Sequence, residues 1–218
     1  MALKAHAQFP MLSAEAEVSL LTIGPGKYLY DAFGHSAFRI KDRSIGLDRV
    51  YNYGSYDSFE EGFYLNFTLG TADYKLARAS FTNFFNVYQR QNRWIKEQVL
   101  DLSAKEVQEI FEYLEVNARP ENAYYRYDQF FDNCATKLRD VPKEVLGEKL
   151  QFKADHLEEF YTMREMVDQN SFNHPWIDLG IDIALGNIID RKATLEEHMY
   201  LPDYVFSGYA NAIIERDG

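Results

Sequence analysis

Two hydrophobic patterns follow one another along this chain, and their order restricts the fold more than any other feature. In the first third, short apolar or alternating runs lie between turn residues, which is typical of β-strands. From Ser103 onward, apolar residues recur at helical spacing. Strands followed by helices predict an α+β domain, in which helices pack on an antiparallel sheet.

The strand pattern can be divided at its turns. Gly24-Pro25-Gly26 ends the first apolar run, and residues 44–48 join the second and third runs as a hairpin turn. The expected strands cover residues 18–22, 36–41, 49–53, 64–69 and 75–80.

The helical part begins with a capping box, in which the side chains of Ser103 and Glu106 each bond to the other residue's backbone N–H. Val107, Ile110 and the apolar residues after them predict a helix that ends near Asn117. Further helices are expected over residues 127–141, 154–166, 179–191 and 201–216.

Composition and charge exclude some functions. The net charge of −11 argues against DNA or RNA as a partner, because phosphates require a basic surface. No segment has the roughly 20 consecutive apolar residues needed to span a bilayer. The chain also contains 16 Tyr and 16 Phe, which indicate either an aromatic β-rich core or an aromatic groove for an acyl chain or a membrane edge.

The first residues suggest an exported protein. Ala5-His6-Ala7 stands before Gln8 and resembles the end of a secretory signal peptide, although so short a triplet also arises by chance. We therefore expect residues 1–17 to be a leader remnant and residues 18–218 to form one catalytic domain with a C-terminal helical extension.

The single cysteine, Cys134, is the first candidate for chemistry. Asp132 or Asn133 is a good N-cap, which places Cys134 in the first turn of a helix. Helix N-termini lower the pKa of a thiol, and the thiolate is the reactive form. The alternative is a buried structural thiol, a common fate of free cysteine.

His35 is the candidate base. It follows Gly34 at the start of an expected strand, and Asn52 on the next strand can face the same way and fix the imidazole tautomer. A histidine at the edge of the core and a polar residue on the solvent face are the alternatives for His35 and Asn52. A paired thiol and imidazole, distant in sequence, would form a nucleophile and its base.

Other polar residues near these motifs are candidates for supporting the site. Asp128 and Asp132 could orient Arg126 or Arg39, or could instead form salt bridges and helix caps. Ser36 could donate to the site or bond locally.

No cofactor and no metal are expected. His174 and His198 match no metal-ligand spacing and are assigned to the surface.

The order of these motifs resembles the circularly permuted papain-like (NlpC-like) fold, with His on a strand, a polar residue on the next strand, and Asn-Cys at a helix start. Several segments also resemble the N-terminal periplasmic domain of the Lnb-type proteins. The most specific are Gly34-His35-Ser36-Ala37-Phe38-Arg39-Ile40 and Asp132-Asn133-Cys134-Ala135-Thr136. The others are residues 51–54, 64–70, Arg93, 125–128, 185–186, 190–191, Thr194 and 201–204.

This resemblance implies a periplasmic protein, anchored to the inner membrane by a C-terminal region outside this sequence, from Bacteroidetes-like bacteria. It also implies lipoprotein N-acyltransfer through a thioester, with Cys134 as nucleophile and His35 as base. The partners would be a phospholipid or lipoprotein acyl donor and a lipoprotein acceptor. A thiol hydrolase or amidase acting on lipid ester or peptidoglycan, and a non-catalytic substrate-binding domain, are the alternatives.

Overall fold

The computed structural model describes residues 9–27, 31–56, 73–171 and 190–216, and these form an α+β domain. Its main sheet has six strands in the order β5-β1-β2-β3-β4-β6, and every neighbouring pair is antiparallel. The strands are β1 (Glu17–Ile23), β2 (His35–Asp42), β3 (Leu47–Ser55), β4 (Asp73–Ser80), β5 (Ile95–Val99) and β6 (Tyr124–Arg126). A second, two-stranded sheet pairs β7 (Leu150–Gln151) with β8 (Ile213–Ile214).

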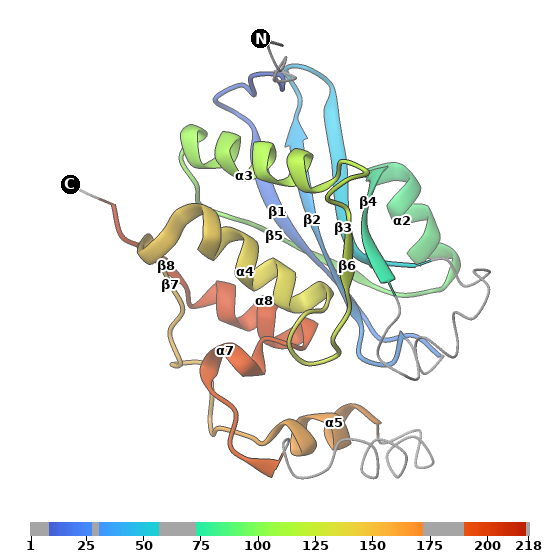
Figure 1. The fold of residues 1–218 in the computed structure, drawn as a ribbon, viewed down its shortest axis with the longest axis vertical. Helices are drawn as coiled ribbons and strands as arrows, with labels where there is room; N and C mark the ends of the chain where they lie inside the picture. Colours follow the sequence, from blue (N-terminus) through green and yellow to red (C-terminus); the bar gives the residue numbers. More distant parts are fainter. Residues whose placement is uncertain (1–8, 28–30, 57–72, 172–189, 217–218) are drawn as a thin grey trace.

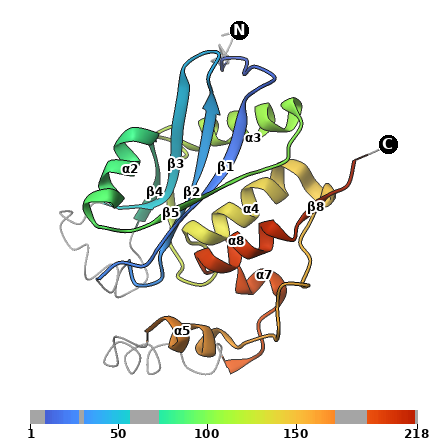
Figure 2. The same ribbon diagram turned by 180° about the vertical axis from the view of Figure 1, so that it is seen from behind.

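Helices cover both faces of the main sheet (Figures 1 and 2). The helices are α2 (Phe81–Arg90), α3 (Ala104–Asn117), α4 (Cys134–Leu146), α5 (Met163–Ser171), α7 (Leu195–His198) and α8 (Pro202–Ala210), with a short 3₁₀ turn at Gly147–Lys149. Helices α3, α4 and α8 lie on one face and α2 lies on the other, while α5 lies beyond the end of the sheet (Figure 1).

Alternation along the strands explains the two layers of core. Phe38 and Ile40 of β2 point to the face covered by α3 and α4, and they pack in one cluster with Ile110 and Leu138. Ala37, one residue before Phe38, points to the opposite face. It shares a second cluster with Leu21, Ile23, Val50 and the buried Phe84 of α2.

Much of the local prediction is confirmed. Four of the expected strands correspond to β1, β2, β3 and β4, and the hairpin turn precedes Leu47. The Ser103–Glu106 capping box is present, and α3 ends at Asn117. The strand expected over residues 64–69 lies outside the described residues, as does most of the helix expected over 179–191.

Three helix predictions were wrong in their limits. The helix expected over 127–141 begins only at Cys134, because Asp128 pairs with Asp132 in an isolated bridge that holds the preceding residues in a turn. The helix expected over 154–166 begins at Met163. The one expected over 201–216 ends at Ala210, since the chain then turns into β8, which pairs with β7.

Several elements were missed from the sequence, among them α2, β5 and β6. Helix α2 follows β4 directly. Its only local signals are the Ser80 cap and an apolar spacing formed by Phe81, Phe84, Phe85 and Tyr88. Strand β5 reads Ile-Lys-Glu-Gln-Val, a charged sequence suited to the sheet edge that it forms beside β1. Strand β6 has three residues and owes its conformation to pairing with β4.

Both ends of the described chain join the main core. Phe9 and Leu12 pack against the cluster between the sheet and α3. Val205 and Tyr209 of α8 are buried in the same cluster. Among the described residues, no helix has the length and apolar character required to span a bilayer.

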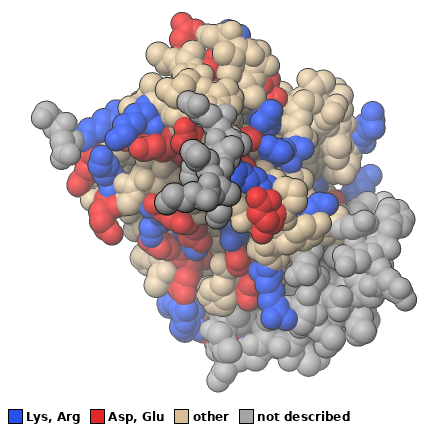
Figure 3. Space-filling model, turned by 45° about the horizontal axis from the view of Figure 1, so that its top comes forward, with Lys and Arg blue, Asp and Glu red and all other residues tan. Residues whose placement is uncertain are grey.

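The charged surface is mixed. On the face shown in Figure 3, acidic and basic side chains are interspersed, and they do not separate into two fields.

Candidate active site

Cys134 is the first residue of α4, and its cap holds it there. The Asn133 side chain accepts hydrogen bonds from the backbone N–H groups of Ala135 (2.8 Å) and Thr136 (2.9 Å). The Thr136 hydroxyl in turn accepts from the backbone of Asn133 (2.8 Å), which completes a capping box. The amide of Asn133 also donates to the carbonyl of Tyr200 (2.9 Å), so the start of α4 is tied to the C-terminal part of the chain.

His35 is the first residue of β2, and Asn52 lies on the adjacent strand β3 with its side chain on the same face. The Nε2 atom of His35 lies 2.5 Å from Oδ1 of Asn52. Because an amide oxygen can only accept, Nε2 carries the hydrogen and Nδ1 is the nitrogen left to exchange a proton. The imidazole also stacks on Tyr88 of α2, with ring centroids 6.2 Å apart.

Gly54 lies beside both Cys134 of α4 and His35 of β2. It has a φ of +84°, and a Cβ placed on it would lie 3.6 Å from Cβ of Cys134 and 3.9 Å from Cε1 of His35. A hydrogen in place of a side chain leaves this space open and removes the cost of the left-handed conformation. Cys134 and His35 are thus both neighbours of Gly54.

The thiol and the imidazole shift each other's titration. Burial alone would raise the pKa of Cys134, but attraction to His35, a hydrogen bond with it, and the backbone N–H groups of Ser36 and Ala135 together hold that pKa below its ordinary value. Burial alone would lower the pKa of His35, but Cys134 and Asn52 outweigh this and raise it, against the opposing charge of Arg93. Both shifts favour the thiolate–imidazolium pair.

Arg39 is a structural residue of the sheet. Its guanidinium binds Asp48 through two bonds of 2.7 Å and Glu97 through bonds of 3.0 and 2.9 Å, and it lies 3.5 Å from the ring centre of Phe81. Asp48 and Glu97 are on β3 and β5, so Arg39 connects both sides of β2 with α2. The predicted pairing of Arg39 with Asp128 or Asp132 is therefore not formed.

The other expected supporting residues are placed as follows. Asp128 accepts from the backbone N–H groups of Phe130 and Phe131 at 2.9 Å and shapes the turn before α4. Asp132 pairs with Lys137 at 2.6 Å, and Arg126 is exposed at the end of β6. Ser36 is fully buried, and its hydroxyl has no hydrogen-bond partner among the described residues.

His198 is buried, which corrects its assignment to the surface. Its Nε2 accepts from the backbone N–H of Tyr161 (3.0 Å), and its Nδ1 donates to the carbonyl of Thr194 (2.8 Å). Within the described ranges no group of His, Cys, Asp and Glu side chains is arranged to hold a metal ion. His174 lies outside the described residues.

Three aromatic or cationic residues that the sequence did not assign to the site belong to it, although Arg93 and Tyr125 lie in segments that resemble the family. Tyr88 stacks on His35, and the guanidinium of Arg93 lies 5.0 Å from the Tyr88 ring centre. Arg93 is buried and donates to the carbonyl of Gly24 (2.7 Å). Tyr125 of β6 lies close to Gly54. No spacing rule links these residues to Cys134, since α2 and β6 were themselves missed.

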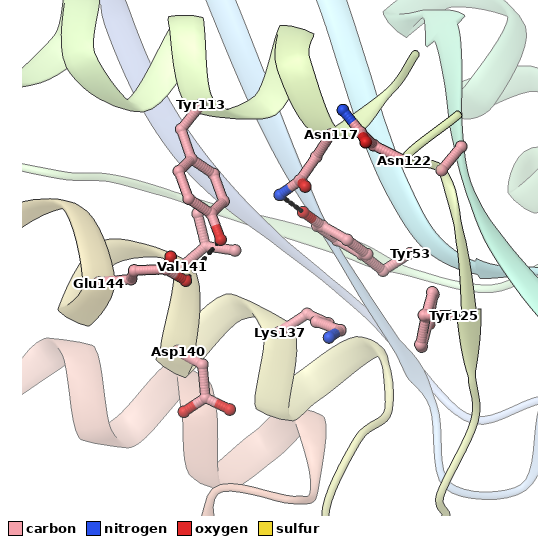
Figure 4. Close-up of a pocket in the computed structure, with 10 residues that line it drawn as sticks. Tyr53, Tyr113, Asn117, Asn122, Tyr125, Lys137, Asp140, Val141 and Glu144 are labelled. Atoms are coloured by element: carbon pink, nitrogen blue, oxygen red, sulfur yellow. Dashed lines mark hydrogen bonds between the residues drawn. The ribbon is translucent and has the colours of Figure 1, made fainter. Parts of the chain in front are cut away.

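A polar cavity of about 130 Å³ lies alongside the site, between α3, α4, β3 and β6 (Figure 4). Tyr125 forms one wall, and Lys137 lies over its ring at 4.7 Å from the centre. The cavity is lined by Tyr53, Tyr113, Asn117, Asn122, Ala123, Tyr125, Lys137, Asp140, Val141 and Glu144.

Comparison with known proteins agrees with these features. A family model described as the Lnb N-terminal periplasmic domain matches residues 10–169, which include the whole six-stranded sheet together with His35, Asn52 and Cys134. No curated protein and no solved structure matches the chain.

Proposed function

The chain belongs to the family of Lnb N-terminal periplasmic domains, and on that premise we propose that it is a cysteine-dependent acyltransferase that N-acylates the N-terminal cysteine of bacterial lipoproteins. The contact between Cys134 and His35, which favours the thiolate at a helix start, is the observation that carries this proposal. The family's periplasmic location is consistent with an acceptor that matures outside the cytoplasm.

We further propose that the fold is a circularly permuted papain-like one. In support, the imidazole comes first, on β2, its polar partner follows on β3, and the thiol comes last at the start of α4, which packs on the same sheet. A papain-like enzyme of ordinary order has the cysteine first and the histidine later.

In the first half-reaction, the Cys134 thiolate attacks an ester carbonyl carbon of the acyl donor. When the tetrahedral intermediate collapses, the ester C–O bond breaks, and protonated His35 gives its proton to the departing alkoxide of the lyso-lipid. The acyl group remains on Cys134 as a thioester, and His35 is neutral.

In the second half-reaction, the neutral α-amine of the lipoprotein attacks the thioester carbonyl. His35 removes a proton from the attacking nitrogen, the C–S bond breaks, and the amide product leaves the thiolate in place. Asn52 keeps Nδ1 directed at the thiol through both steps, because it holds the opposite nitrogen at 2.5 Å.

The decisive experiment compares the membrane-anchored protein with its Cys134→Ala and His35→Ala variants. Each is incubated with a phospholipid and a diacylated lipoprotein, and the lipopeptide is weighed by mass spectrometry. We expect one added acyl chain with the unaltered protein and a loss of several orders of magnitude in rate with either variant, since nucleophile and base act as a unit.

The products also test the alternatives. Free fatty acid without N-acylated lipopeptide would identify a hydrolase that uses the same thioester. Retained N-acylation by Cys134→Ala would contradict the mechanism. Arg126→Ala is a suitable control, because this exposed residue lies at the end of β6 and is expected to leave the rate unchanged.

A further inference from the structure

The Tyr125 hydroxyl is a buried polar group whose hydrogen bonding is incomplete. No hydrogen-bond partner is present for it among the described residues, although buried hydroxyls in folded proteins are nearly always satisfied. The backbone N–H of Gly54 approaches the phenolic oxygen without making a full hydrogen bond. The hydrogen of the hydroxyl is thus available for an acceptor that enters the site.

Its position relates it directly to the reacting groups. The Tyr125 oxygen, Cβ of Cys134 and Cε1 of His35 all lie within 4 Å of one point, the place where a side chain on Gly54 would begin. Tyr125 and Cys134 are both half-buried, so a carbonyl group that reaches the sulfur also reaches the neighbourhood of the hydroxyl.

The ring of Tyr125 is held from two sides. Tyr53 packs edge-on against it, with ring centroids 6.0 Å apart, and the Lys137 ammonium lies 4.7 Å from its centre. Lys137 is itself fixed by Asp132 at 2.6 Å. Figure 4 shows Tyr125 on its own strand, facing the helix that carries Lys137. A donor held in this way needs little reorganisation when charge develops beside it.

We propose that Tyr125 is a catalytic residue of the acyl transfer, whose hydroxyl donates a hydrogen bond to the oxyanion formed when Cys134 attacks a carbonyl carbon. This assignment rests on the proposed function for the identity of the substrate, but it applies to any acyl group that the thiol accepts. No proton is transferred in this step, since the phenol only donates a hydrogen bond and keeps its hydrogen.

The electrostatic surroundings suit a neutral donor. Burial, followed by the negative charge of the Cys134 thiolate, raises the pKa of Tyr125 well above its ordinary value. The hydroxyl therefore stays protonated wherever the thiolate is present, and it can stabilise an oxyanion over the whole working range of pH.

Two reagents separate oxyanion stabilisation from the reactivity of the thiol. A p-nitrophenyl ester acylates Cys134 through a tetrahedral oxyanion, whereas iodoacetamide alkylates it by direct displacement, without one. For Tyr125→Phe we expect the nitrophenol burst to slow by about 10²–10³, as for other oxyanion donors. The rate and pH dependence of alkylation should remain within twofold of the original.

Tyr113→Phe is the matched control, because it removes a hydroxyl of the same cavity that donates to Glu144 and has no contact with Tyr125 or the thiol among those described. It should leave both rates unchanged. Equal burst rates for Tyr125→Phe and the unaltered protein would overturn the assignment, and so would a parallel loss of alkylation, which would mean that Tyr125 merely positions the thiol. Neither reagent requires a lipoprotein, so failure of this proposal is distinct from failure of the proposed function.

Discussion

At the scale of single residues, the proposed chemistry depends on Cys134, His35 and Asn52, which are linked through the two nitrogens of the imidazole. Asn52 accepts from one nitrogen of His35, and the other nitrogen serves the thiol. Burial works against both charges of the pair, but mutual attraction and hydrogen bonds outweigh it. The surroundings of Cys134 thus favour the thiolate form, which the proposed mechanism requires.

This coupling predicts a specific pH dependence. Because the pKa of Cys134 is lowered, alkylation by iodoacetamide should reach half its maximal rate below the value of a free thiol, about 8.5. In His35→Ala the attraction and the hydrogen bond of the imidazole are lost, while burial and the backbone N–H groups of Ser36 and Ala135 remain, so the midpoint should move above that of the unaltered protein. Measurement of the alkylation rate against pH for both proteins checks this, and superimposable curves would contradict the coupling.

Asn52→Ala gives an intermediate case. It removes one of the interactions that raise the pKa of His35, while the thiol keeps its partner. Its alkylation midpoint should lie between those of the other two proteins.

At the scale of elements, α4 is the part of the fold on which the site depends most. Its N-cap, Asn133, is buried and makes bonds to the first turn of the helix and to the carbonyls of Gln129 (2.6 Å) and Tyr200 (2.9 Å). One side chain thus fixes the first turn of α4, the preceding loop and the C-terminal part of the chain. The position of the thiol follows from all three.

We predict that Asn133→Ala lowers the free energy of unfolding by about 2–4 kcal/mol, since a helix cap and a buried hydrogen bond are lost together. It should also raise the midpoint of Cys134 alkylation, because the first turn of α4 is no longer held. Urea unfolding and the alkylation curve measure the two effects.

Ser103→Ala is the matched control for this prediction. Ser103 forms the equivalent capping box of α3 but is exposed and belongs to another helix. It should cost about 1 kcal/mol and leave the thiol unchanged. A shift of the alkylation midpoint in this variant as large as in Asn133→Ala would show that general destabilisation, and not the cap of α4, controls the thiol.

At the scale of the whole molecule, charged side chains connect strands that are not neighbours. The Arg39 guanidinium is buried on β2 and reaches Asp48 on β3, Glu97 on β5 and the Phe81 ring on α2. On the other face, Glu115 of α3 receives hydrogen bonds from Arg49, Arg78 and the hydroxyl of Tyr51. These groups tie α2 and α3 to opposite faces of the sheet.

Arg39→Met tests whether this residue serves the fold or the chemistry. Loss of a buried guanidinium with two carboxylate partners should lower the free energy of unfolding by about 1–3 kcal/mol, less than for a fully buried pair because both carboxylates are partly exposed. The alkylation rate of Cys134 should not change. Lys41→Ala, which breaks a longer and more exposed pair with Glu17, should cost less than about 1 kcal/mol.

Slower alkylation of Cys134 in Arg39→Met, at temperatures where the protein remains folded, would show that Arg39 also contributes to the reactivity of the thiol.

Residues that follow the matched region contribute to the main core. The family model ends at residue 169, yet Met199, Val205 and Tyr209 are buried in the main core. The Tyr209 hydroxyl donates to the carbonyl of Leu138 in α4 (2.7 Å). The environment of α4 is therefore built from both parts of the chain.

The sequence by itself determined the features that depend on near neighbours. Ser103 with Glu106 predicted the start of α3, because a cap bonds within one helical turn. The expected cap at Asp132 or Asn133 placed Cys134 in a first helical turn, as in α4, although the apolar spacing had extended that helix back to residue 127. Alternation placed His35 and Asn52 on the same face of adjacent strands, and the structure confirms their contact. The family resemblance was likewise confirmed from motifs of a few residues.

Only the tertiary structure decided which distant groups meet. The sequence offered Arg39, Asp128 and Asp132 as partners, but packing gave each a different one. It brought Tyr88 and Tyr125 to the thiol and imidazole from a helix and a strand with weak local signals. The physical reason is that a local pattern fixes the direction of a side chain along its own element, whereas its neighbours across the core depend on how whole layers pack.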